Sequence, residues 1–167
     1  MRLAFLLCLL AAPAVAEAPY DAFAEAVAPC YDAATMRTEI EACQGIAASA
    51  CFEGAPDGQT TYGMMQCLIS EGGAWDAILN REYGRARDWA RQRDAEDAGG
   101  PTESAREQTL RDAQRAWIAF RDANCAMEYA AWGAGSMRMI AGADCVNRMT
   151  FERVLDLRDY GAPLGSE

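Results

Sequence analysis

Cysteines are the residues of this chain with the clearest chemistry, and their number and spacing favour disulfides. An even number of cysteines in a small secreted chain is typical of a disulfide framework. The chain has no Cys-x-x-Cys pair and no histidine, which disfavours a zinc site and a redox site. Beyond an apolar N-terminal run that contains Cys8, six cysteines remain: Cys30, Cys43, Cys51, Cys67, Cys125 and Cys145.

A long gap in the spacing divides these six cysteines into a group of four and a group of two. The pair Cys125–Cys145 is therefore the most strongly indicated, and closing its loop should stabilise the fold by about 3 kcal/mol. Within the group of four, we favour Cys30–Cys43 with Cys51–Cys67. The alternative, Cys43–Cys67 with Cys30–Cys51, suits an antiparallel pair of helices about as well.

Other kinds of catalytic chemistry lack their usual residues. A Ser–His or Cys–His nucleophile needs histidine, which the chain does not contain. Paired carboxylates can hydrolyse glycosides, but a chain with 25 acidic residues contains such pairs by chance. The stretch Gly133-Ala134-Gly135 lacks the strand-to-helix context of a phosphate-binding loop. We therefore predict no catalytic residues, no cofactor, no metal, and a protein that is not an enzyme.

The N-terminus has the three-part pattern of a secretory signal. Arg2 precedes an apolar run, and Ala14-Val15-Ala16 supplies the small residues of a cleavage site. The run is too short to span a membrane, which takes about 20 apolar residues, and Cys8 in its middle is badly placed for lipid attachment. We expect a signal peptide over residues 1–16 and a periplasmic or secreted mature chain that begins near Glu17 and does not insert into a membrane.

The chain is acidic, with a net charge of −10 and no lysine. Loss of Arg2 with the signal would leave 14 arginines against 25 acidic residues, a net charge of −11. Such a balance argues against nucleic acid or an anionic membrane surface as a partner. A solvated acidic surface is the simpler explanation, and attraction to a basic partner is the alternative.

Helix-forming residues dominate the mature chain, and alternating strand patterns are scarce. We predict an all-α fold over residues 17–167, a single domain built as a small disulfide-stabilised helical bundle. The helical segments are 32–50, 60–93 with a kink or break at Gly72-Gly73, 104–131 and 144–160, with a loop over 132–142. A short acidic turn over 94–101 should join the second and third segments as a central antiparallel hairpin.

Polar side chains on those two segments are placed to meet if the hairpin forms. Asp76 and Asn80 are one turn apart on one helix, and Gln114 and Arg121 are two turns apart on the next. A carboxylate and two amides can satisfy the guanidinium fork. We predict a buried polar network that fixes the register of the two helices, with a binding site as the alternative. Trp117 and Phe120 share a face and are predicted to pack in the core.

Longer motifs surround these residues. The third segment contains Leu110-x-x-Ala113-Gln114-Arg115-Ala116-Trp117-Ile118-x-Phe120-Arg121-Asp122-Ala123-x-Cys125. Upstream lies Trp75-Asp76-x-x-Leu79-Asn80-x-x-Tyr83, and downstream Cys145 is followed by Thr150-x-x-Arg153-x-x-x-Leu157. Over roughly residues 30 to 160 the chain resembles the LprI-type lysozyme inhibitor-like family. The resemblance implies an exported helical protein of bacteria, and some members of that family inhibit lysozyme.

Two features depart from the family pattern. The founding type is a lipoprotein, whereas this chain lacks a lipobox, and the region of Cys43, Cys51 and Cys67 has more cysteines than the simplest members. We predict an exported periplasmic binding protein whose partner is a lysozyme or other muramidase. An envelope structural or interaction module without inhibitory activity, and a small cell-wall hydrolase, are the alternatives. The acidic turn with Asp94, Glu96 and Asp97 is the candidate for attracting a basic enzyme.

Overall fold

The computed structural model describes residues 19–98 and 105–160, whose regular elements are all helices. The predicted signal peptide, with Cys8, lies outside the described residues. Four short helices precede three long ones, and the predicted all-α, disulfide-stabilised bundle is confirmed. None of the described helices is both long and apolar enough to cross a membrane. The helices are α1 (Asp21–Ala24), α2 (Val27–Ala33), α3 (Arg37–Glu41), α4 (Ile46–Gly54), α5 (Thr61–Glu96), α6 (Arg106–Ala131) and α7 (Met137–Asp159).

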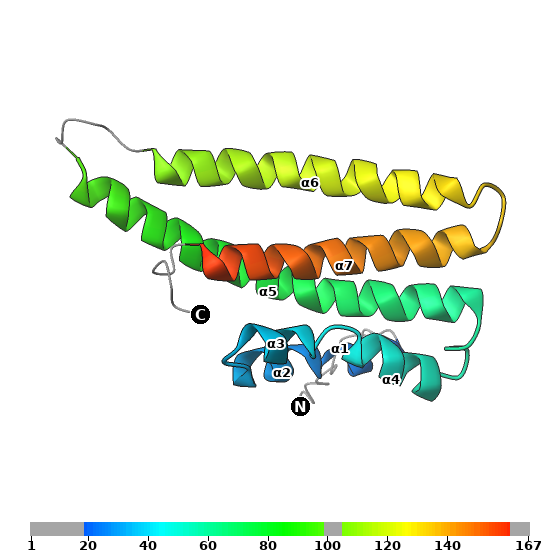
Figure 1. Cartoon of the computed structure of the whole chain (residues 1–167). Coiled ribbons are helices and arrows are strands. Elements are labelled where there is room, and N and C mark those ends of the chain that lie inside the picture. Colours follow the sequence, from blue (N-terminus) through cyan, green and yellow to red (C-terminus); the bar gives the residue numbers. More distant parts are fainter. Residues whose placement is uncertain (1–18, 99–104, 161–167) are drawn as a thin grey trace, which may run out of the picture.

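The three long helices form the body of the molecule, and the C-terminal helix α7 lies between α5 and α6 (Figure 1). Helices α1 to α4 cover the other side of α5. At the end of the α5–α6 hairpin, Arg87 donates a hydrogen bond to Glu107 across 2.7 Å, and this bond lowers the pKa of the Glu107 carboxyl below its ordinary value. Farther along, the two helices diverge and α7 fills the space between them.

Helix α5 runs unbroken through Gly72-Gly73, so the kink or break predicted there does not take the form of a break. The helix starts at a Thr60 cap, whose side chain accepts a hydrogen bond from the Gly63 amide at 3.0 Å. Glycine weakens a helix in isolation, but packing on the neighbouring helix offsets that cost. Gly72 lies against α7, where an added Cβ would sit 3.5 Å from the Cα of Asn147.

The predicted single helix over 32–50 is also wrong, because the structure divides this region among α2, α3 and α4. Extended backbone at Ala34 and Met36 separates α2 from α3, and Gly45 with φ of 83° starts α4. Glu39 accepts hydrogen bonds from the amides of Thr35 and Met36, which caps the new helix at that point. Local capping thus breaks a stretch whose composition favours one helix.

The predicted loop over 132–142 is shorter in the structure, where only residues 132–136 form a turn before α7 begins at Met137. Gly133, with φ of 55°, makes the reversal, and Arg138 donates to its carbonyl oxygen at 3.2 Å. Methionine, alanine and arginine are good helix formers. They extend α7 by two turns beyond the predicted start at residue 144.

Three disulfides fasten successive parts of the bundle. Cys30–Cys43 ties α2 to the turn that follows α3, Cys51–Cys67 joins α4 to α5, and Cys125–Cys145 joins α6 to α7. Their Cα–Cα distances are 5.9, 5.6 and 5.4 Å, within the usual range. These are the pairs that the spacing of the sequence favoured.

Trp75 is the centre of the core. Its side chain is fully buried, and its ring meets Tyr31 of α2 and Phe151 of α7 edge to face, with centroids 6.2 and 4.9 Å away. Edge-to-face pairs of aromatic rings add to the stability that their burial gives. Trp75 thus contacts both neighbours of α5, with α2 on one side and α7 on the other.

Next to Trp75 lies a buried carboxylate, Glu71, whose side chain is fully buried. It accepts hydrogen bonds from the amides of Gly45 and Ala48, each at 2.7 Å, from Trp75 Nε1 at 3.2 Å and from Asn147 Nδ2 at 3.3 Å. Two of these donors belong to the first turn of α4, where the helix dipole favours a negative charge. Glu71 therefore joins α4, α5 and α7 at one point.

Candidate functional site

A cleft opens between α5 and α7, with the C-terminal half of α6 on one side, and its volume is about 630 Å³. This volume is within the usual range for small-molecule binding sites. Most of the wall is apolar, and the side chains that form it come from α5 and α7: Met65, Leu68, Ile69, Met139 and Val146.

Glycines shape this cleft. An added Cβ at Gly73 would meet no atom within 4 Å, so the α5 side of the cleft is open there. On α7, an added Cβ at Gly142 would lie 3.2 Å from the ring of Tyr129, which rests against the helix at that position. The missing side chain at Gly73 thus leaves the cleft open, and the missing side chain at Gly142 lets Tyr129 approach α7 closely.

Four polar side chains line the cleft: Asp76, Arg121, Asn147 and Thr150. Arg121 donates to Asp122 at 3.0 Å and to the Thr150 hydroxyl at 3.4 Å. Asn147 is 4% exposed, and its Oδ1 has no hydrogen-bond partner in the structure. The cleft therefore combines apolar walls with one cation and one carboxylate, which suits binding of an amphipathic group.

Large apolar side chains are exposed on the rim of the cleft. Ile69 is 51% exposed, Tyr129 40% and Val146 37%, and all three line the cleft. Trp132, 52% exposed, lies close by in the chain, in the turn between α6 and α7. Exposed apolar groups around a concave site are typical of a protein-binding surface.

The predicted polar network between α5 and α6 is wrong. Asn80 donates to Asp76 of its own helix at 3.0 Å, and both side chains are exposed. Gln114 instead accepts a hydrogen bond from Arg153 of α7 at 3.0 Å. Because α7 lies between α5 and α6, the inward polar groups of α6 meet α7, and Arg121 reaches Thr150 there. Of the predicted set, only Asp76 and Arg121 reach the cleft.

Trp117 is half-buried at the same α6–α7 contact. The guanidinium carbons of Arg121 and Arg153 lie 5.1 and 5.8 Å from the centre of its ring, within the range of cation–π contacts. The interface thus stacks an aromatic ring with two cations and adds the Gln114 hydrogen bond. These are the residues of the central and downstream motifs, and their role in the described structure is to hold α6 against α7.

The remaining motif residues divide between core and surface. Leu79 is buried with Trp75, and Tyr83 is half-buried beneath the guanidinium of Arg87 at 5.7 Å. Phe120 is 60% exposed, so the prediction that it packs in the core is wrong. Trp117 lies at the edge of the α6 face that meets α7, and Phe120, almost a turn farther on, is already beyond that edge.

The acidic turn is not the free anionic surface that the sequence suggests. Asp94 accepts hydrogen bonds from the amides of Arg106 and Glu107 at 3.1 and 3.0 Å, so it caps the start of α6. Asp97 pairs with Arg106 at 2.6 Å, and Glu96 pairs with Arg93 at 2.7 Å. Neutralising these three acids would weaken α6 as well as change the charge.

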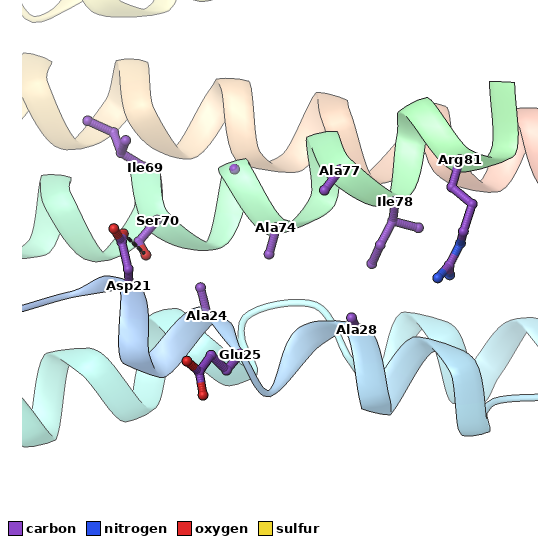
Figure 2. A pocket seen from close by; sticks show the side chains of 11 residues that line it. Asp21, Ala24, Glu25, Ala28, Ile69, Ser70, Ala74, Ala77, Ile78 and Arg81 are labelled. Carbon is purple, nitrogen blue, oxygen red and sulfur yellow. Dashed lines mark hydrogen bonds between the residues drawn. The ribbon is translucent and has the colours of Figure 1, made fainter. Parts of the chain in front are cut away.

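A second groove of about 620 Å³ lies on an adjacent face of α5, against α1 and α2, and shares Ile69 and Gly73 with the cleft (Figure 2). Figure 2 shows Ala24 and Ala28 facing Ala74 and Ile78 across it. Its polar groups are largely engaged, since Asp21 accepts from the Ser70 hydroxyl at 2.9 Å and Arg81 pairs with Asp32 at 2.6 Å.

The described residues contain neither a free thiol nor a cluster of metal ligands. Their six cysteines are all in disulfides, and they hold no group of three or more metal-ligating side chains close enough to share an ion.

Sequence reasoning missed Glu71 and Asn147. Both lie on buried helical stripes, Glu71 one turn before Trp75 and Asn147 one turn before Phe151. A polar residue within an otherwise apolar stripe was the signal in the sequence that could have identified both.

Replacing Arg121 with alanine should lower the free energy of unfolding by about 1 to 2 kcal/mol. The loss is modest because Asp122 is exposed and can be solvated, which leaves mainly the Thr150 hydrogen bond and the Trp117 stacking to lose. Urea unfolding measures it. Arg115→Ala is the control, since that side chain is 67% exposed and should cost nothing measurable. A loss above about 3 kcal/mol for Arg121→Ala would show a buried charge network instead.

Comparison with known proteins gives one match. A protein-family model described as lysozyme inhibitor LprI matches residues 51–157, from the middle of α4 almost to the end of α7. The comparisons with curated proteins and with solved structures gave no match. The matched region contains the long helices that form the cleft.

Proposed function

This chain belongs to the lysozyme inhibitor LprI family, and we propose that it is an exported protein that binds and inhibits a lysozyme-like muramidase. The match over residues 51–157 is the observation that carries the proposal. The signal-like residues 1–16 and three disulfides support export to the periplasm or beyond, because disulfides persist in oxidising compartments. In that compartment the protein would meet enzymes that cleave the cell wall.

The contact surface in this proposal is the cleft with its apolar rim. Ile69, Tyr129 and Val146 supply exposed apolar area, which drives most protein association once it is buried. On the cleft wall, the exposed Asp76 carboxylate can accept hydrogen bonds from a cationic or amide side chain of the enzyme. A partner with a protruding apolar segment and an adjacent basic group fits this arrangement.

Charge supports the same proposal over a longer range. The mature chain would carry 14 arginines against 25 acidic residues, so a basic muramidase is attracted to it as a whole. Ion pairs already compensate the acidic turn. The net field, and not that turn, would therefore set the rate of encounter.

Clearance of a cell-wall suspension by a muramidase tests the proposal. Added mature protein should inhibit clearance by a basic lysozyme or by a bacterial muramidase in a saturable way. Val146→Gln should weaken this inhibition about tenfold or more, because it places a polar amide in the buried contact, a change worth about 1.4 kcal/mol or more.

The matched control is Ile118→Gln. Ile118 is an aliphatic side chain of a long helix with similar exposure, 42% against 37%, but it does not line the cleft. It should inhibit like the wild type. Equal inhibition by both variants would show that the enzyme contacts a surface other than the cleft. If the wild type inhibits neither enzyme at micromolar concentration, an envelope interaction module without inhibitory activity becomes the better account.

A further inference from the structure

A stripe of apolar residues runs along the solvent side of α6. Phe120 is 60% exposed and Met127 64%, which makes them two of the most exposed large apolar side chains among the described residues. Exposed alanines continue the stripe at alternating steps of three and four residues, the spacing of a coiled-coil seam. The stripe consists of Ala113, Ala116, Phe120, Ala123, Met127 and Ala130.

This stripe is separate from the side of α6 that meets α7. The inner side carries Leu110, Gln114 and Arg121, and α6 forms the outermost layer of the bundle (Figure 1). No member of the stripe is charged, while Arg115 and Asp122 lie on the other exposed flank of the helix. A monomer therefore leaves a second helix-packing face in water.

The order of large and small residues makes the stripe complementary to itself. Consider a second α6 laid antiparallel, with the two-fold axis between residues 121 and 122. Phe120 then faces Ala123 of the second copy, and Met127 faces Ala116 of the second copy. Each large side chain meets an alanine, so knobs fill holes without a clash between two large groups. Such an isologous contact closes with two copies.

We propose that this protein forms a homodimer through the α6 stripe, with the two α6 helices antiparallel. The occupant is a second copy and not a basic enzyme, since the stripe offers no carboxylate and its pattern complements itself. No residue of the stripe lines the cleft, whose α6 residues are Arg121 and Tyr129. Dimer formation is therefore independent of the proposed inhibition and leaves that surface open.

The size of the stripe and the charge of the chain set the strength of the dimer. From Ala113 to Ala130 the helix rises about 25 Å, which is short for an interface of standard size, about 800 Å² per partner. Two acidic chains also repel each other. The dimer should form in the range of tens to hundreds of micromolar, and salt should strengthen it by screening the repulsion. Attraction to a basic muramidase has the opposite dependence on salt.

Sedimentation equilibrium of the mature, oxidised protein tests the proposal. From about 10 μM to about 1 mM, the mean mass should rise from monomer towards dimer, and more steeply at high salt. Phe120→Glu should stay monomeric, and Ile118→Glu, on the other exposed flank of α6, should dimerise like the wild type. Both positions are exposed, so both variants should keep the melting temperature. A wild type that stays monomeric throughout, or two variants that behave alike, overturns the proposal.

A mixture of two variants tests the orientation. Met127→Glu and Ala116→Arg should each be monomeric alone, because each places one charge in the apolar seam. Mixed in equal amounts they should form a heterodimer, since the antiparallel register brings the introduced carboxylate to the introduced guanidinium. A parallel pair would set each of these positions against its own counterpart. A mixture that remains monomeric contradicts the antiparallel arrangement.

Discussion

Replacing Glu71 with alanine should lower the free energy of unfolding by about 3 to 5 kcal/mol, among the largest losses expected for any single substitution in this chain. Four donors converge on this carboxylate from Gly45, Ala48, Trp75 and Asn147. Alanine would leave them unpaired in a site with no access to water. Thermal unfolding should show the midpoint falling by about 10 °C or more.

Two further variants show whether the carboxylate itself is responsible. Glu71→Gln keeps the shape but points an NH₂ donor at backbone donors, so it should also destabilise, by about 2 kcal/mol or more. Glu53→Ala removes an exposed glutamate of α4 and should change stability by less than about 0.5 kcal/mol. If Glu71→Ala unfolds like Glu53→Ala, the hydrogen bonds of Glu71 do not hold α4 on the bundle.

Replacing Trp75 with alanine should cost about 3 to 5 kcal/mol through the cavity that it leaves. The ring is fully buried between Tyr31 and Phe151, and three disulfides limit how far the helices can close on the gap. Denaturant unfolding with the disulfides intact measures the loss.

Trp75→Phe separates packing from the hydrogen bond to Glu71. Phenylalanine keeps much of the aromatic contact but removes the indole donor, so about 1 to 2 kcal/mol should be lost. Combined with Glu71→Ala, the two effects should be less than additive, because both changes remove the same hydrogen bond. A Trp75→Ala variant within about 1 kcal/mol of the wild type would contradict the central place of this ring in the core.

Local patterns in the sequence predicted the helical class and the pair Cys125–Cys145, and they favoured the other two disulfides over one alternative. They also predicted that α5 and α6 are antiparallel, but not that α7 lies between them. They failed where distant contacts decide the outcome. Gly72-Gly73 reads as a break, yet α5 is continuous there because α7 packs along it. Phe120 sits at helical spacing from Trp117, and only the position of α7 shows that one is half-buried and the other exposed. Periodicity identifies the apolar face of a helix, but it does not show which neighbouring element covers that face.

The candidate site shows the same division. Asp76 and Arg121 were predicted from the sequence to be buried between helices. Both line the cleft, but Asp76 is exposed and Arg121 is half-buried. Their predicted partners, Asn80 and Gln114, form other contacts because α7 separates α5 from α6. Asp94 looked like a free surface charge, and only the structure places it on the first amides of α6. These contacts depend on which helices become neighbours in the fold, and local sequence patterns do not show that.

Direct binding to a muramidase tests the proposed function most directly. Calorimetric titration of a basic lysozyme and of a bacterial muramidase with the oxidised, mature protein should give saturable binding to at least one enzyme. Affinity for a basic enzyme should fall as the Debye length shrinks from about 10 Å at 0.1 M salt to about 3 Å at 1 M. Protein that has been reduced and capped with iodoacetamide keeps its charge but loses its disulfides, and it should not bind. Absence of binding to either enzyme at micromolar concentration and low salt, or equal binding by the capped protein, would contradict the proposal.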